Sequence, residues 1–223
     1  MALKKLFARQ QNAAALLFAA AFLAFAALPL RAEPLGQAAP SLERVAELLA
    51  KHKVTRGQFV LERMSANGKA LKSSGDFVIA ADYGIIWKTE KPIKAAQVVA
   101  REWTLTESAG GKRVKMDASK NPVYKQMAVL TSALWTGDLQ AVQSAADLNF
   151  WSDEKSWRIE MFPKDQAIQM ALEKIIVEGT CGGGTAAATK MQMFLKGGNS
   201  AAYVMSGHAF SDTLSASERA YFD

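Results

Sequence analysis

Short alternating segments separated by turn residues run through most of the chain after residue 57, and they constrain its fold most strongly. Residues 57–81 are predicted to form two strands joined at Asn67-Gly68, a dipeptide that favours a tight hairpin turn. Further predicted strands follow at 85–89, 94–101, 103–108, 112–116, 148–151, 157–162, 171–178, 187–195 and 203–210. Evenly spaced short strands predict an antiparallel meander in an α+β, mainly β, fold.

Helical segments interrupt this strand pattern. Residues 41–52 carry apolar side chains at helical spacing behind a capping serine, and Pro122 suits the first turn of a helix over 122–135. A short helix is expected from Asp138, and another over 215–222. Because no repeat or linker divides the chain, we expect residues 33–223 to form a single domain.

The N-terminus has the three-part layout of a secretory signal peptide. A basic start with Lys4, Lys5 and Arg9 precedes an apolar run over 13–28, and small residues lead to an exit at Ala32. The alternative is an uncleaved anchor, but the apolar run is shorter than the roughly 20 residues that span a bilayer core. We therefore predict a signal peptide at residues 1–32 and a periplasmic mature protein.

Charge and cysteine content argue against nucleic-acid binding and against a reactive thiol. The whole chain has a net charge of +6, but residues 1–32 carry four cations and no acid, which leaves +2 for the remainder. This balance gives weak support to nucleic-acid binding, so no nucleic-acid partner is expected. Cys181 is the one cysteine, and it is expected to be a buried, inert thiol. We also expect a monomer.

The sequence offers little catalytic chemistry. His52 and His208 lie outside any metal-ligand spacing, and no GxSxG nucleophile motif is present. The loop over 181–184 lacks the residues of a phosphate-binding loop, and it is expected to be a flexible turn. Asp147 and Asp153 are expected to be solvated loop charges. The chain is therefore predicted not to be an enzyme, with no cofactor and no metal.

Several predicted strands carry apolar residues on both faces, as in Val78-Ile79 and Ile85-Ile86-Trp87. One interpretation is that helices cover the second face of the sheet. The other is that one face covers a core while the opposite face lines an apolar cavity. The sequence alone leaves both interpretations open.

Residues 73–92 contain Gly75 at a strand start, the bend Tyr83-Gly84, Trp87 and Pro92. In this order the segment resembles the LolA-like periplasmic outer-membrane lipoprotein carrier family, and the tail over 214–222 resembles the divergent branch of that family. The resemblance implies a half-open antiparallel β-barrel of about 10–11 strands with a helical lid, which holds acyl chains. It also implies an inner-membrane donor complex and an outer-membrane acceptor for the lipid or acylated lipoprotein cargo.

One position departs from the pattern of the family. Classical members carry an Arg-Pro pair before the bend, where this chain has Ala81 and Asp82. In the family, that arginine helps to hold the lid over the empty cavity. Its replacement argues against classical lipoprotein trafficking. Divergent members of the family serve other lipids or exporters of lipid-like products.

Strand alternation identifies candidate lipid-binding residues. Those predicted to share one face are Phe59, Leu61, Phe77, Ile79, Ile85 and Trp87, and the candidate lid contributes Met127, Leu130 and Leu134. Core packing is the alternative role for each of them.

The resulting functional expectation is a periplasmic carrier that shelters acyl chains between the inner and outer membranes. The alternative is a non-carrier scaffold module that docks an exporter or an outer-membrane assembly. A hydrolase of lipid-like esters would need a nucleophile and a base that the sequence does not identify.

Overall fold

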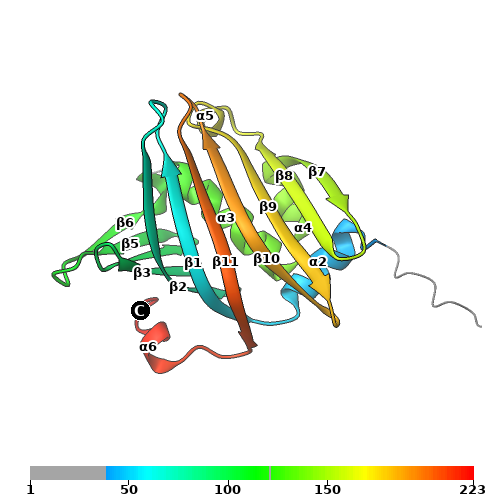
Figure 1. Cartoon of the computed structure of the whole chain (residues 1–223), viewed down its shortest axis with the longest axis horizontal. Helices are drawn as coiled ribbons and strands as arrows, with labels where there is room; N and C mark the ends of the chain where they lie inside the picture. Colours follow the sequence, from blue (N-terminus) through cyan, green and yellow to red (C-terminus); the bar gives the residue numbers. More distant parts are fainter. Residues whose placement is uncertain (1–38, 121) are drawn as a thin grey trace, which may run out of the picture. The chain divides into compact units, whose positions relative to one another are not determined.

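Figure 1 shows the computed structural model, which describes residues 39–120 and 122–223. The described residues belong to one unit, Gln37–Asp223. The predicted signal peptide at 1–32 lies outside the described residues, so the domain boundary near residue 33 stays a prediction. Within the described part of the chain, no helix is both long and apolar enough to cross a bilayer.

Over residues 39–120 and 122–223, a single sheet of eleven antiparallel strands forms the framework, in the order β6-β5-β4-β3-β2-β1-β11-β10-β9-β8-β7. Its strands are β1 Val54–Met64, β2 Ala70–Ala80, β3 Gly84–Lys91, β4 Ala95–Ala100, β5 Trp103–Glu107, β6 Arg113–Asp117, β7 Ala146–Ser152, β8 Ser156–Pro163, β9 Leu172–Gly182, β10 Thr185–Leu195 and β11 Ser200–Ser211. Because β6 and β7 are the two edges, the sheet is not closed, and the predicted half-open antiparallel architecture is confirmed.

Local turn chemistry sets the strand register. The β1–β2 turn is closed by the Lys69 carbonyl, which accepts the Ser65 N–H at 2.9 Å, while Gly68 adopts a φ of 78°. The β9–β10 turn consists of Gly183 and Gly184, both at positive φ, which lie between the paired residues Gly182 and Thr185. Two consecutive residues at positive φ suit the right-handed twist of a hairpin. The predicted turn at 181–184 is therefore a tight hairpin.

The described part of the chain adds six helical segments to the sheet: α2 Leu42–Ala50, the 3₁₀ segment η1 Ala118–Lys120, α3 Pro122–Thr136, α4 Leu139–Ala145, α5 Gln166–Gln169 and α6 Ala216–Arg219. The predicted caps are present, since Ser41 Oγ accepts the Arg44 N–H at 3.2 Å and Asp138 accepts the Ala141 N–H at 2.9 Å. Helix α5 was not predicted. Its four residues are too few to show a periodic pattern, and Asp165 caps it.

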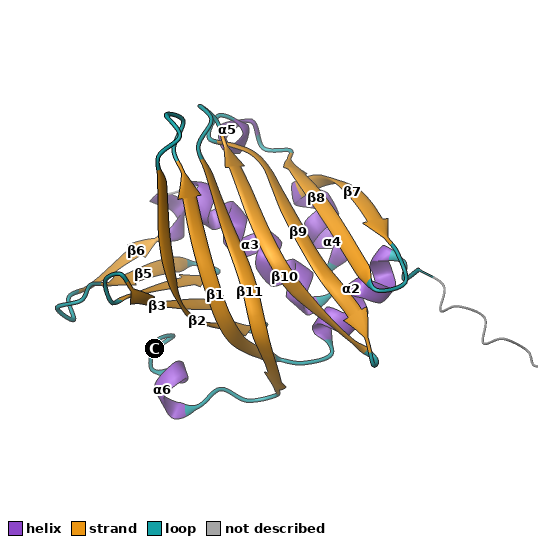
Figure 2. Ribbon diagram, in the orientation of Figure 1, coloured by secondary structure: helices purple, strands orange, loops and turns teal. Residues whose placement is uncertain are grey.

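Helices and the C-terminal segment cover opposite faces of the sheet. Helices α2, α3 and α4 lie behind the sheet in Figure 2, and their apolar side chains join the larger core cluster on its concave face. On the convex face, Val78 and Ile86 belong to a second cluster, which Leu214, Tyr221 and Phe222 cover. Other segments of the chain thus cover both apolar faces of β2 and β3. This agrees with the interpretation in which the second face of the sheet is covered.

Candidate functional site: a cavity at the hairpin end of the sheet

The six predicted strand residues lie together on the concave face. Phe77 pairs with Trp87 and Ile79 pairs with Ile85 across β2 and β3, and all four belong to the larger core cluster. Phe59 packs its ring edge-on against Trp87, with ring centroids 5.0 Å apart. Leu61 completes the set in the same cluster. The alternation therefore located one face correctly, while lipid contact by these residues stays a prediction.

Helix α3 packs against the same core. Leu130 and Leu134 are each 1% exposed and belong to the concave-face cluster. The side chain of Met127 lies outside the described ones. The described residues that line the large cavity do not include any from α3, so Leu130 and Leu134 hold core positions here. A lid role for 122–135 stays a prediction.

A cavity of about 990 Å³ lies beyond this core, at the end of the sheet formed by the β1–β2 and β10–β11 turns. Figure 1 shows these turns and α5 at the same end of the molecule. The apolar residues that line the cavity are Met64, Leu71, Trp87, Val99, Met170, Ala171, Met193, Leu195, Ala201 and Tyr203. Ligand pockets commonly measure about 300–1,000 Å³ and are mostly apolar, so this cavity has the size and the character of a binding site.

Packed aromatic rings form the inner wall of the cavity. The Trp87 ring lies 4.3 Å from that of Tyr203 and 5.8 Å from that of Phe77, measured between centroids. Trp87 and Tyr203 line the cavity, whereas Phe77 lies behind them in the core. Aromatic rings in such contact hold one another in place. Among the predicted site residues whose side chains the structure describes, Trp87 alone lines the cavity.

The rim of the cavity combines exposed apolar side chains with positive charge. Leu71 is 72% exposed and Met170 is 82% exposed. Arg63, Lys69 and Lys196 also line the cavity, and the described lining residues include no Asp or Glu. An apolar interior with a cationic rim can hold a molecule that is apolar at one end and polar at the other.

A much smaller space lies beside Ala81, at the bend between β2 and β3. Ala81 lines a cavity of about 20 Å³ together with Ile79, Ile85 and the α3 residues Ala128 and Trp135. This volume is enough for about one water molecule. The hydrogen bond from Gln126 Nε2 to the Ala145 carbonyl oxygen at 3.2 Å, together with apolar packing, holds α3 in place.

The two histidines and Asp153, which the sequence analysis considered as candidate catalytic groups, each contact another residue of the fold. His52 stacks on Phe210 with ring centroids 4.8 Å apart, and His208 Nε2 lies 2.8 Å from the Ala188 carbonyl oxygen. Cys181 is half-buried, rather than fully buried as expected, and burial raises the pKa of its thiol. Asp153 accepts the Lys155 N–H at 2.8 Å within its turn. Within the described ranges, no three metal-ligating side chains cluster.

Most of the cavity lining was missed from the sequence. Continuing the alternation from Leu61 places Arg63 on the same face, and it places Leu71 opposite Arg63. Met193 lies on β10 and Tyr203 on β11, and no local pattern indicates that β11 pairs with β1 and β10 with β11. The alternation within each strand indicates which residues share a face. The strand order is needed to show which of these residues meet around the cavity.

No protein-family model and no curated protein matches the chain. Among solved structures, it is similar to a DUF1329 family protein from Desulfovibrio piger, with TM-score 0.46, 12% identity, and coverage of 82% of this chain and 94% of that chain. It is also similar to a LolA superfamily protein from Nitrosomonas europaea, with TM-score 0.42, 10% identity, and coverage of 82% and 95%. A third is LprF from Mycobacterium bovis, with TM-score 0.38, 12% identity, and coverage of 81% and 97%.

Proposed function

We propose that this protein is a periplasmic carrier that shelters the acyl chains of lipoproteins or other lipids between the inner and outer membranes. The observation that carries the proposal is the cavity of about 990 Å³, with Trp87, Met193 and Tyr203 on its walls. Its apolar walls suit a hydrocarbon chain, and its rim leaves a polar end of the same molecule near water.

The energetics of burial fit reversible transport. Sheltering one CH₂ group from water contributes roughly 0.8 kcal/mol, so a long acyl chain contributes on the order of 10 kcal/mol. That free energy is enough to hold a lipid during passage through water. It is also small enough for an acceptor with a better fit to remove the lipid without covalent chemistry or ATP. An inner-membrane donor and an outer-membrane acceptor complete the proposal, with the carrier acting as a monomer.

A test fills the cavity and compares the lipid bound by the purified mature protein. Ala201 is 7% exposed and lines the cavity, so Ala201→Trp places a large ring inside it. Val204 is 50% exposed on the opposite face of the same strand, so Val204→Trp is the matched control. We expect mass spectrometry of organic extracts to find lipid with the parent and with Val204→Trp, and a severalfold smaller load with Ala201→Trp.

Urea unfolding of both variants checks that each retains the parent fold. An equal lipid load in a folded Ala201→Trp variant contradicts the cavity as the binding site. Absence of lipid from every form, together with failure to bind any added amphiphile, contradicts the carrier and favours the scaffold alternative.

A further inference from the structure

Positive charge is concentrated at one place in the candidate cavity. Arg63 lies near the end of β1, Lys69 in the β1–β2 turn and Lys196 directly after β10, and all three line the cavity. The described lining residues include no carboxylate. This imbalance is local, because the chain without residues 1–32 carries a net charge of only +2.

No carboxylate among the described residues forms an ion pair with these three cations. The ion pairs between described residues do not include Arg63, Lys69 or Lys196. By contrast, Lys72 on the same hairpin pairs with Glu62 at 3.7 Å, and neither residue lines the cavity. Like charges around one opening repel one another and attract an anion.

The two turns that carry the lysines are joined by a hydrogen bond. Asn199 Oδ1, in the β10–β11 turn, accepts the Ala66 N–H of the β1–β2 turn at 3.2 Å. On β1, Arg63 stands two residues after the buried Leu61, and it pairs with Ala201 of β11. All three cations are therefore placed at the rim by strand register and by turns that support one another.

The cavity is thus graded from a cationic rim to an apolar interior. The walls at Trp87, Met193 and Tyr203 are each less than a tenth exposed, whereas Arg63 and Lys69 are exposed to solvent. A ligand that satisfies both parts has a hydrocarbon tail and an anionic end. Phosphate and carboxylate both accept charge-assisted hydrogen bonds from arginine and lysine.

We propose that the cargo is an anionic amphiphile, whose phosphate or carboxylate group binds Arg63, Lys69 and Lys196 while its tail occupies the cavity. This inference rests on the proposed carrier function and specifies the cargo class. In this proposal the protein recognises the cargo through charge and apolar burial alone, without covalent chemistry.

The test uses displacement of the neutral fluorescent probe N-phenylnaphthylamine from the folded mature protein below micelle-forming concentrations. Its competitors are dodecyl phosphate, dodecanoate, dodecanol and inorganic phosphate. We expect the two anionic amphiphiles to displace the probe at concentrations about tenfold lower than dodecanol, a difference equivalent to about 1.4 kcal/mol. Inorganic phosphate should not displace it, because the tail provides most of the binding. Added salt should reduce the preference for anions.

The decisive variant replaces Arg63, Lys69 and Lys196 by glutamine. It should lose the preference for anionic amphiphiles and keep its affinity for dodecanol. The control replaces Lys53, Lys112 and Lys155, three exposed cations outside the cavity lining, by glutamine and removes the same charge. It should behave as the parent does.

Other outcomes separate the cargo class from the carrier function. If dodecanol competes as well as dodecyl phosphate with the parent, the anionic cargo is wrong and the carrier function stands. If no amphiphile displaces the probe, the carrier function fails as well. If the rim variant keeps its preference for dodecyl phosphate but loses binding to vesicles of anionic phospholipid, the cations contact a membrane surface and the cargo inference is overturned.

Discussion

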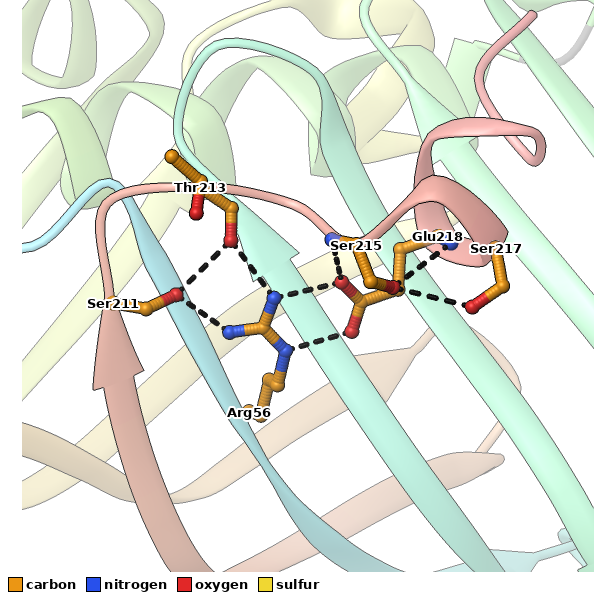
Figure 3. Close-up of polar contacts among 6 residues, drawn as sticks. All are labelled: Arg56, Ser211, Thr213, Ser215, Ser217 and Glu218. Carbon is orange, nitrogen blue, oxygen red and sulfur yellow. Dashed lines mark hydrogen bonds and ion pairs between the residues drawn. The ribbon is translucent and has the colours of Figure 1, made fainter.

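The guanidinium of Arg56 on β1 holds both carboxylate oxygens of Glu218 on α6, with Nε 2.7 Å from Oε1 and Nη2 2.7 Å from Oε2 (Figure 3). Arg56 also donates to Ser211 Oγ at 2.6 Å and to the Thr213 carbonyl at 2.9 Å. The Ser215 N–H donates to Glu218 Oε2 at 2.7 Å. This network ties the C-terminal segment to β1, and so it positions the side chains that cover the convex face.

Replacing Arg56 should destabilise the fold. Glu218 has only 10% of its side chain exposed, so Arg56→Ala leaves a nearly buried carboxylate without its cation. We expect a loss of about 3 kcal/mol in the free energy of unfolding, measured by urea denaturation. Lys94→Ala is the control, because that lysine forms an exposed pair with Glu90 and its loss should cost less than about 1 kcal/mol. Equal losses in the two variants would contradict the assigned role of Arg56.

The same ion pair predicts a pH dependence of stability. Hydrogen bonds from Arg56 lower the pKa of Glu218 from 4.5 to about 2. Because the pKa is lower in the folded state, the stabilisation is present above pH 4.5 and is lost as the pH falls toward 2. The contribution at neutral pH is at most about 3 kcal/mol. Urea midpoints measured across this range should fall less steeply for Glu218→Gln than for the parent; parallel curves would argue against it.

The sequence predicted the concave face of β1–β3 because each determinant is local. Apolar residues at every second position fix which side chains share a face, and Gly68 and Gly84 supply the positive φ angles of the turns between these strands. The facing pair Phe77 and Trp87 therefore follows from a short stretch of chain.

The cavity depends on strand order, which short-range patterns do not encode. It forms because β1 pairs with β11, which brings Arg63 opposite Ala201 and Leu61 opposite Tyr203. The Arg56–Glu218 pair likewise joins the first strand to the last helix. Parity within a strand could not distinguish Phe59, which lies in the core, from Trp87, which also reaches the cavity.

Gly75 should tolerate no side chain. A Cβ at this position would lie 1.8 Å from the Lys88 carbonyl oxygen, which is backbone and cannot move aside without disturbing β3. We expect Gly75→Ala to lower the free energy of unfolding by about 3 kcal/mol in urea denaturation. Gly110→Ala is the matched control, since no atom lies within 4 Å of its added Cβ. A neutral Gly75→Ala would show that β2 and β3 do not approach this closely.

Substitution of Leu130 can show whether α3 is a core helix or a lid. It is 1% exposed, and α3 packs against β3 and β4. If α3 is a core helix, Leu130→Ala should cost about 3 kcal/mol, and the amides of α3 and β3 should exchange hydrogen together. Gln140→Ala, at an exposed site on α4, should leave both measurements unchanged. Fast exchange confined to α3 while β3 stays protected, with a small loss for Leu130→Ala, would instead identify α3 as a lid that opens without unfolding the sheet.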